Sequence, residues 1–261
     1  MQQPLYQIKN LTAHVKKELV LTISNLEIHR GIAYAIVGKP GAGKTSLLEI
    51  LARQQAPSGG TILYDGEPVA GGEANRTFDE EVYYLPQAPS KGWAARGKVE
   101  DYMLRGIRTA SWSSDSASDR LQEAGRRMGL SKLFGRKVKT LSPGERRWVD
   151  LAVCLASDAK VLIVDALELH LSPDELDLVK RQIQRKCSSE GTTAMLSTLN
   201  PNTLRRMTGI SVTLDRGRIA MIRSVREGGR GRRSPRKEGN GGRASKGGDG
   251  RASRAGPQRR R

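Results

Sequence analysis

The chain has 261 residues, of which 37% are hydrophobic and 28% charged, and its formal net charge is +18. This length allows one large α/β domain or two small ones with a substantial buried core. No apolar run approaches the roughly 20 residues that a membrane span needs, and no basic segment precedes an apolar one at the N-terminus, so we expect a cytosolic protein. Two cysteines, Cys154 and Cys187, are too few for a disulfide framework or a cysteine-rich metal site.

The first strands are expected in a small antiparallel layer. Apolar and polar residues alternate over residues 5–11, 19–23 and 26–28, as they do in half-buried strands. The same pattern returns at residues 61–64, ahead of the turn dipeptide at residues 65–66.

A glycine-rich loop separates an apolar strand at residues 32–37 from a helical segment at residues 46–53. In this context the glycines let backbone N–H groups surround phosphate oxygens, and the helix N-terminus adds partial positive charge. Lys44 is expected to neutralise the β and γ phosphates of a nucleoside triphosphate, and Thr45 to offer its hydroxyl to Mg²⁺. A glycine-rich turn with a chance Lys-Thr pair is the competing interpretation. The expected binding residues of this loop are Gly38, Lys39, Pro40, Gly41, Ala42, Gly43, Lys44, Thr45 and Ser46.

A helical insertion is expected over about residues 97–140. Residues 99–105 and 119–128 have helical spacing, and the polar stretch at residues 111–118 is expected to separate the two helices.

The following elements complete an α/β pattern. Asp165 directly follows the apolar run Val161–Val164. This pattern suits a parallel strand that is buried on both faces and has an acid at its carboxyl end. A helix from Pro173 to about Lys186 and a strand at residues 193–196 follow, and strands at residues 210–214 and 219–222 form a closing hairpin. The predicted fold class is α/β: a P-loop NTPase core with a mostly parallel sheet over residues 1–223, a small antiparallel β-subdomain and the helical insertion.

Several motifs follow one another in a fixed order. They are the phosphate loop, Tyr84-Leu-Pro-Gln87, Leu141-Ser-Pro-Gly-Glu145, the strand followed by Asp165, residues 193–200 and the closing hairpin. This order resembles the ATP-binding subunit of ABC transporters, over residues from about 4 to 222. The resemblance implies ATP and Mg²⁺ as cofactors and head-to-tail pairing with an identical or different second ATP-binding subunit. It also implies that this chain binds a transmembrane permease from the cytoplasmic face of the membrane.

The resemblance assigns roles to two polar residues near the phosphates. Gln87 is expected to touch Mg²⁺ or the attacking water, and Asp165 to hold Mg²⁺, which prefers oxygen ligands. Thr45, Gln87 and Asp165 are thus the expected metal residues. The competing interpretations are a surface glutamine in a proline-containing loop and a carboxylate that caps a helix or turn.

The signature segment departs from the family's Leu-Ser-Gly-Gly-Gln pattern. Ser142 and Gly144, which in the family face the γ-phosphate bound to the partner subunit, are kept. Pro143 replaces a glycine and removes one backbone donor, and Glu145 replaces a glutamine. The segment also fits a simple helix start, with Ser142 as cap and Pro143 at the first helical position, and the two interpretations are compatible.

The resemblance assigns no catalytic residue. Ala166 stands where the family has the glutamate that polarises water, and Leu199 where it has a histidine that contacts the γ-phosphate. Losing a positioned general base costs about 10²- to 10⁴-fold in rate, so we expect binding to survive and hydrolysis to be slow. A shifted loop would be needed for Glu168 or His170 to substitute, and solvated loop charges are the default expectation.

Base recognition stays open at this stage. His14 and Val15 fall near the position where the family stacks an aromatic side chain on adenine. A histidine stacks more weakly than a larger aromatic ring, and a solvent-facing histidine at a strand end is the competing interpretation.

The C-terminal segment from residue 224 is expected to be disordered. Residues 226–261 hold 13 Lys and Arg against 3 Asp and Glu, with no aromatic residue and no Val, Ile, Leu or Met. The charge suits anionic lipid or the phosphates of RNA, and a solvated tail without a partner is equally compatible. It also leaves a second function open, that of an ATP-dependent switch or adaptor that docks on membrane or ribosome.

Overall fold

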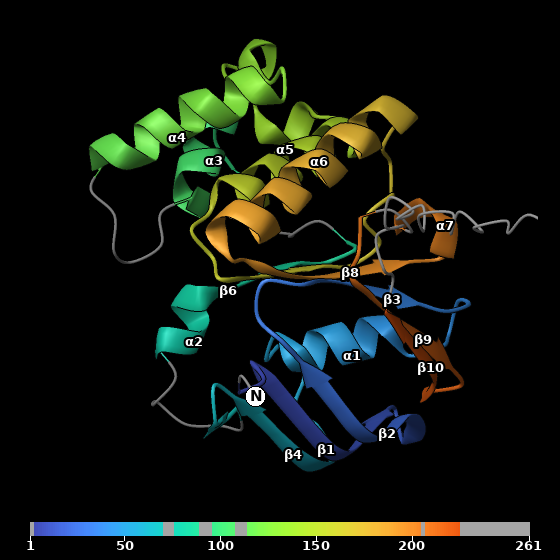
Figure 1. The fold of residues 1–261 in the computed structure, drawn as a ribbon. Helices are drawn as coiled ribbons and strands as arrows, with labels where there is room; N and C mark the ends of the chain where they lie inside the picture. The colour runs from blue at the N-terminus through green and yellow to red at the C-terminus, as the bar shows by residue number, and fades with distance from the viewer. Residues whose placement is uncertain (1–2, 70–75, 89–95, 108–113, 205–206, 225–261) are drawn as a thin grey trace, which may run out of the picture. The chain divides into compact units, whose positions relative to one another are not determined.

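The computed structural model describes residues 3–69, 76–88, 96–107, 114–204 and 207–224 (Figure 1). The chain divides into one compact unit over Met1–Glu227 and a second over Gly228–Arg261, and all described residues belong to the first. The expected start of the disordered tail at residue 224 was wrong by one residue, because Ser224 pairs with Ile210 at the end of the last strand. The expectations of disorder and of lipid or RNA contacts for the rest of the tail lie outside the described residues and stay predictions. In the described part of the chain, no helix combines the length and apolar character needed to cross a bilayer.

A six-stranded sheet forms the centre of the unit, in the order β10-β9-β3-β8-β7-β6. All neighbouring pairs are parallel except β9 and β10, which form the expected antiparallel hairpin. Because the carboxyl ends of parallel strands meet at one edge, the loops that follow β3, β6, β7 and β8 lie together there. The strands are β3 (Ala33–Val37), β6 (Val82–Leu85), β7 (Val161–Val164), β8 (Thr193–Thr198), β9 (Ile210–Asp215) and β10 (Arg218–Ser224).

Alternate residues of the central strands enter two different cores. In β3, Ala33, Ala35 and Val37 face one hydrophobic cluster, whereas Tyr34 and Ile36 face the other. The first cluster lies under the helical part of the unit, and the second includes α1 and the N-terminal strands. Burial on both faces explains why these strands are continuous apolar runs.

The expected antiparallel layer is present as a second sheet, in the order β2-β1-β4-β5. Helix α1 (Lys44–Leu51) lies between this sheet and the six-stranded one (Figure 1). The rings of Tyr6, Tyr64 and Phe78 pack edge to face on one another, with centroids 5.0 to 6.4 Å apart. The strands are β1 (Tyr6–Val15), β2 (Glu18–Ile28), β4 (Gly59–Tyr64) and β5 (Glu67–Pro68), so β1 and β2 are longer than the alternating segments predicted.

The other face of the six-stranded sheet carries the helices of the insertion together with α5 and α6 (Figure 1). The prediction that residues 111–118 separate two helices was wrong in part, because α4 already begins at Ser114. Ala117 is buried in the same core cluster as Leu121, Ala124 and Met128. This apolar stripe stabilises the helix from its first turn, although the sequence there is polar. Residues 111–113 lie outside the described part. The helices are α3 (Val99–Ile107), α4 (Ser114–Arg127), α5 (Pro143–Ala156) and α6 (Pro173–Glu190).

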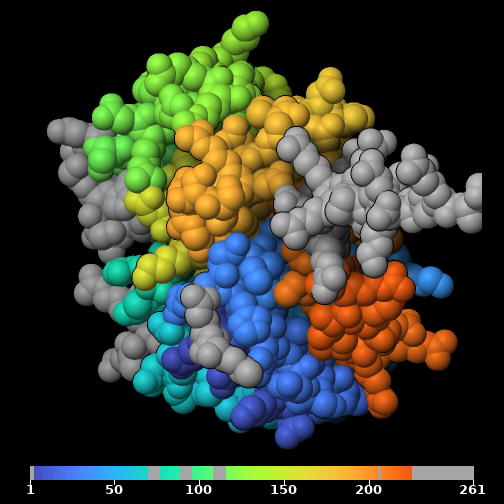
Figure 2. Space-filling view, in the orientation of Figure 1, coloured from blue at the N-terminus to red at the C-terminus, as the bar shows by residue number. Residues whose placement is uncertain are grey.

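Four short elements link these layers. The turns α2 (Arg76–Glu81) and α7 (Pro201–Leu204) flank the sheet, and 3-10 turns lie at Ser131–Leu133 and Val138–Thr140. The closing hairpin returns to the N-terminal strands, as the orange and blue surfaces of Figure 2 show. At its turn, the Gly217 carbonyl accepts from the Thr22 amide at 2.8 Å, and the Gly217 amide donates to the Ala42 carbonyl at 3.2 Å. The hairpin therefore supports the phosphate loop directly.

Candidate functional site

A cleft of about 520 Å³ opens at the carboxyl edge of the six-stranded sheet. This volume is within the range of small-ligand sites, about 300 to 1,000 Å³. Its wall is built from the phosphate loop, the start of α1, the loops after β6, β7 and β8, and two valines of β1 and β2. The fold thus brings together sequence segments that are up to about 180 residues apart.

The phosphate loop has the backbone that its glycines were expected to allow. Gly41 and Gly43 have φ of 77° and 93°, in the left-handed region that favours glycine. A Cβ at Gly38 would lie 2.5 Å from the Leu214 carbonyl oxygen, so only glycine lets the loop pass this close to β9.

Lys44 is folded over this loop. Its Nζ donates to the carbonyl oxygens of Gly38 at 2.8 Å and Lys39 at 3.0 Å, and the residue is only 9% exposed. Burial lowers the pKa of the Lys44 ammonium, while Asp165 and Glu168 oppose the shift. An ammonium in this position presents its charge to the cleft, where phosphate would lie.

Thr45 and Asp165 meet beside Lys44. The Thr45 hydroxyl donates to Oδ2 of Asp165 at 2.7 Å, across 120 residues of sequence. Asp165 is 1% exposed, and its Oδ1 accepts from the Ser197 hydroxyl. That hydroxyl also accepts from the Ala166 amide at 2.7 Å, so Ser197 fixes the carboxylate and the backbone after it.

The Thr45 and Asp165 oxygens form a donor set that suits Mg²⁺, a hard cation that prefers oxygen and keeps several waters. No group of three or more His, Cys, Asp or Glu side chains converges within the described ranges. Thr45 and Asp165 are the residues that would hold such an ion. Gln87 lines the same cleft as an exposed side chain, within the region where such an ion would bind.

Sequence reasoning missed Ser197, although the sheet register would have found it. Val164 of β7 pairs with Leu196 of β8, so the residues that follow each of them are neighbours. The signal is a serine that follows one strand at the same level as an acid that follows the neighbouring parallel strand.

The two departures from the family pattern both face the cleft. Ala166 and Leu199 line it with hydrocarbon alone, and Leu199 is 58% exposed. A methyl group and an isobutyl group offer neither a proton acceptor nor a hydrogen-bond donor.

Glu168 lines the cleft beside them. Its Oε1 accepts from the Thr198 hydroxyl at 2.9 Å and from the Leu199 amide at 3.0 Å. His170 is exposed and has a left-handed backbone, with φ of 61°. The structure therefore turns Glu168, and not His170, toward the phosphate-binding elements.

Of the residues expected near the base, Val15 lines the cleft together with Val20, whereas His14 does not. His14 is exposed, and its backbone amide donates to the Ser58 hydroxyl at 3.0 Å. A base bound here would pack on aliphatic side chains instead of an aromatic ring.

Val15→Tyr is expected to tighten Mg-ATP binding about tenfold, because stacking of a base on an aromatic ring contributes about 1–3 kcal/mol. Isothermal titration calorimetry measures the change in dissociation constant. His14→Tyr, one residue away and outside the cleft wall, is the matched control and should leave the constant unchanged. An equal effect of both variants would contradict this placement of the base.

The signature segment begins α5 with a capping box. The Ser142 hydroxyl accepts from the Glu145 amide at 3.2 Å, and Glu145 Oε2 accepts from the Ser142 amide at 2.8 Å. Pro143 occupies the first turn, where its missing N–H is not needed. The Ser142 amide and the Arg136 guanidinium lower the pKa of Glu145. Ser142 and Pro143 are exposed, and Gly144 approaches the His170 carbonyl so closely that an added Cβ would lie 3.3 Å from it.

Arg147, also missed by sequence reasoning, joins this helix to the cleft loops. The residue is 4% exposed and donates to three backbone carbonyls: Pro86 at 2.7 Å, Asp165 at 2.6 Å and Ala166 at 3.0 Å. Burial lowers the pKa of its guanidinium. Arg147 lies only two residues after Glu145, so the signature segment is next to a clamp on the loops that carry Gln87 and Asp165.

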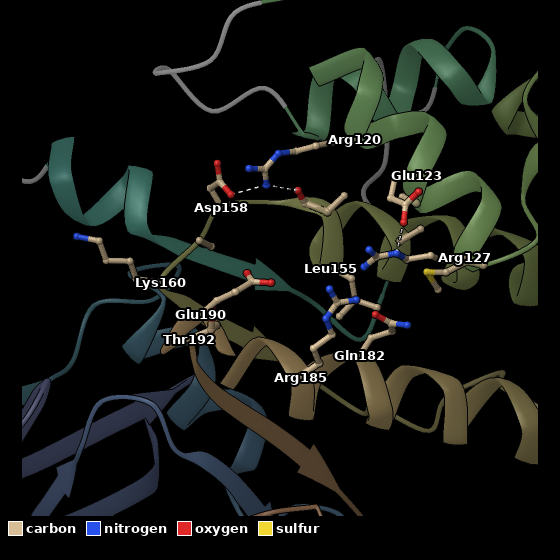
Figure 3. Close-up of a pocket in the computed structure, with 15 residues that line it drawn as sticks. Arg120, Glu123, Arg127, Leu155, Asp158, Lys160, Gln182, Arg185, Glu190 and Thr192 are labelled. Carbon is tan, nitrogen blue, oxygen red and sulfur yellow. Dashed lines mark hydrogen bonds and ion pairs between the residues drawn. The ribbon is translucent and has the colours of Figure 1, made fainter. Parts of the chain in front are cut away.

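A second cavity of about 530 Å³ lies between α4, α5 and α6 (Figure 3). Arg120 pairs there with Asp158, and Arg127 with Glu123. None of the phosphate-loop residues lines it. Of these two cavities, only the first is lined by the phosphate loop.

Comparison with known proteins identifies the family. A family model described as ABC transporter matches residues 21–167, more than half of the chain. The chain belongs to the ABC transporter family. A solved structure titled as the ATP binding subunit of an ABC transporter matches with a TM-score of 0.76 at 21% identity, covering 85% of this chain and 90% of that one. The predicted P-loop NTPase fold of ABC cassettes is thus confirmed.

Two relatives show how this ABC transporter protein compares in length. The lipoprotein-releasing system ATP-binding protein LolD of Paramagnetospirillum magneticum is 31% identical over 194 residues, which cover 72% of this chain and 84% of that protein. The methionine import ATP-binding protein MetN 1 of Pseudomonas putida is 30% identical over 210 residues, covering 79% of this chain. The matched part is 62% of that relative's length.

Proposed function

We propose that this chain is the ATP-binding subunit of an ABC transporter, which binds Mg-ATP and drives or regulates a separate membrane permease. The observation that carries the proposal is the meeting of Lys44, Thr45 and Asp165 in one cleft. The lysine would bind two phosphates, and the hydroxyl and carboxylate would bind magnesium. Together these charges complement those of a Mg-nucleoside triphosphate.

Hydrolysis at this site is proposed to be slow. The cleft offers no carboxylate at Ala166 and no imidazole at Leu199. A transition state that lacks a well-placed base is reached more slowly, and binding that relies on Lys44 and the loop amides does not depend on that base.

A second ATP-binding subunit, identical or different, is proposed as a partner. Ser142 and Pro143 are exposed, and no residue of the signature segment lines the cleft of its own chain. Head-to-tail pairing would place Ser142 and Gly144 against the γ-phosphate of the partner's ATP. The assembly is proposed to sit at the cytoplasmic face of the membrane against the permease, which sets the transported substrate.

Calorimetric titration of the purified protein with Mg-ATP tests the proposal. We expect binding in the micromolar range, dependence on magnesium, and slow release of phosphate by the protein alone. Absence of a binding signal over a range of salt and temperature would overturn the proposal of an ATP site. Brisk hydrolysis would overturn the proposal that the site is slow.

A further inference from the structure

Glu168 lines the nucleotide cleft, and only one of its two carboxylate oxygens has hydrogen-bond partners. Oε1 is held by the Thr198 hydroxyl and the Leu199 amide, both at the end of β8. Oε2 is buried and finds no hydrogen-bond partner among the described residues. Leaving a buried, charged oxygen without a hydrogen-bond donor is costly, so a donor that reaches Oε2 would be favoured there.

The backbone after Asp165 explains how this side chain reaches inward. Ala166 has a left-handed φ of 51°, and the Leu169 amide donates to the Ala166 carbonyl at 3.1 Å. This tight turn, followed by a bond from the Leu171 amide to the Glu168 carbonyl at 3.3 Å, curls the chain back toward β8. The segment is fixed at its start as well, because the Ala166 amide donates to Ser197 and the Ala166 carbonyl accepts from Arg147.

The neighbours of Glu168 are the phosphate-binding groups. It lines the same cleft as Lys44, Thr45 and Gln87, and its charge opposes the effect of burial on the pKa of Lys44. After β8, Leu199 replaces the histidine that was expected to contact phosphate. Instead, the Leu199 backbone amide holds Glu168.

We propose that Glu168 is the catalytic carboxylate of this site, and that the slow hydrolysis of ATP proceeds through its Oε2. The inference rests on the proposed function, namely that the cleft holds Mg-ATP. Oε2 accepts a proton from the attacking water while the water oxygen forms a bond to the γ-phosphorus. The bond from that phosphorus to the β–γ bridging oxygen breaks, ADP leaves with the electron pair, and the proton passes from Glu168 to phosphate or solvent. Because Oε2 is buried, the carboxyl group of Glu168 must turn toward the cleft for this step.

Glu168→Gln tests the role with little change of shape. The amide oxygen can still accept from Thr198 and Leu199, whereas the amide nitrogen cannot accept a proton. We expect single-turnover ATP hydrolysis to slow about tenfold or more, because a positioned base contributes about 10²- to 10⁴-fold when its geometry is ideal. The dissociation constant for Mg-ATP and the melting temperature should stay near those of the unmodified protein.

The variant Ala166→Glu provides a second measurement that a structural role would not affect. It places an acid directly after Asp165, and we expect hydrolysis to rise about tenfold or more. In that background Glu168→Gln should lose most of its effect, because water activation no longer depends on Glu168. A purely structural Glu168 would instead produce the same loss in both backgrounds, together with lower stability.

The outcomes separate the inference from the proposed function. Failure of the unmodified protein to bind Mg-ATP would overturn both. Binding with no detectable turnover, or turnover that is unchanged in Glu168→Gln, would overturn the inference and leave the ATP site intact. Equal losses in both backgrounds would also overturn it. Slower turnover with unchanged binding, suppressed by Ala166→Glu, is the result that supports it.

Discussion

Replacing Lys44 by alanine is expected to weaken Mg-ATP binding about 100-fold or more, because the ammonium contributes hydrogen bonds to charged phosphates at about 1.5–3 kcal/mol each. Lys44 is the buried cation of the phosphate loop, and its Nζ already lies 2.8 Å from the Gly38 carbonyl. Alanine would leave the backbone amides as the main phosphate ligands. Calorimetry with Mg-ATP measures the loss.

Lys39→Ala is the matched control for this variant. Lys39 belongs to the same loop and carries the same charge, but its side chain is exposed. We expect its effect on affinity to be small and to shrink further with added salt, as for surface charges in general. Similar losses for Lys44→Ala and Lys39→Ala would show that only the loop's overall charge matters, and would contradict the placement of Lys44 on the phosphates.

A loss of folding would imitate a loss of binding in Lys44→Ala, because Nζ also ties two loop carbonyls together. Gly38 is half-buried and Lys39 is exposed, so we expect water to replace the lysine at their carbonyls. The melting temperature of the variant without nucleotide should therefore fall only slightly. Lys44→Arg keeps a cation in the loop, but its larger, planar fork cannot occupy the same place, so partial binding at most is expected.

Local signals in the sequence were sufficient for the phosphate loop and the central strands. Gly41 and Gly43 stand where positive φ is needed, and the apolar runs of β3 and β7 match strands that are buried on both faces. The capping box at Ser142 is equally local, since its two partners are three residues apart. These features depend on neighbours in the chain and can be read without the fold.

Other parts of the fold depend on contacts that the sequence does not display. Strand β6 was not predicted, because it has four residues, of which only Leu85 is buried, and so shows no clear period. The start of α4 depends on Ala117 meeting a distant core. Arg147 contacts a carbonyl 61 residues away, and Glu168 depends on amide and hydroxyl donors about 30 residues away. Their roles appear only once the loops after β6, β7 and β8 are brought to one edge.

Arg147→Met is expected to lower the free energy of unfolding by about 3 kcal/mol, because it removes a buried cation and leaves three carbonyl acceptors without their donor. The methionine is similar in length and apolar, so little cavity is created. Urea unfolding measures the effect as a lower midpoint with an unchanged slope.

Arg126→Met is the control for the loss of an arginine from a helix of the same part of the structure. The Arg126 side chain is 73% exposed and pairs with Glu123 on the surface of α4. Such pairs contribute about 0–1 kcal/mol, so the midpoint should hardly move. Comparable destabilisation by the two variants would contradict the view that the carbonyl clamp stabilises the fold.

The clamp also predicts an effect on ligand affinity, although Arg147 does not line the cleft. Two of its acceptors are the carbonyls of Pro86, just before Gln87, and of Asp165 itself, so the guanidinium sets the spacing of the expected magnesium residues. Mg-ATP affinity should fall several-fold in Arg147→Met, but less than in Lys44→Ala, because the phosphate contacts stay in place. Binding of ATP without magnesium should change less, since only the metal residues are displaced. If the affinity with magnesium is unchanged while stability falls, Arg147 supports the fold alone and does not position the metal residues.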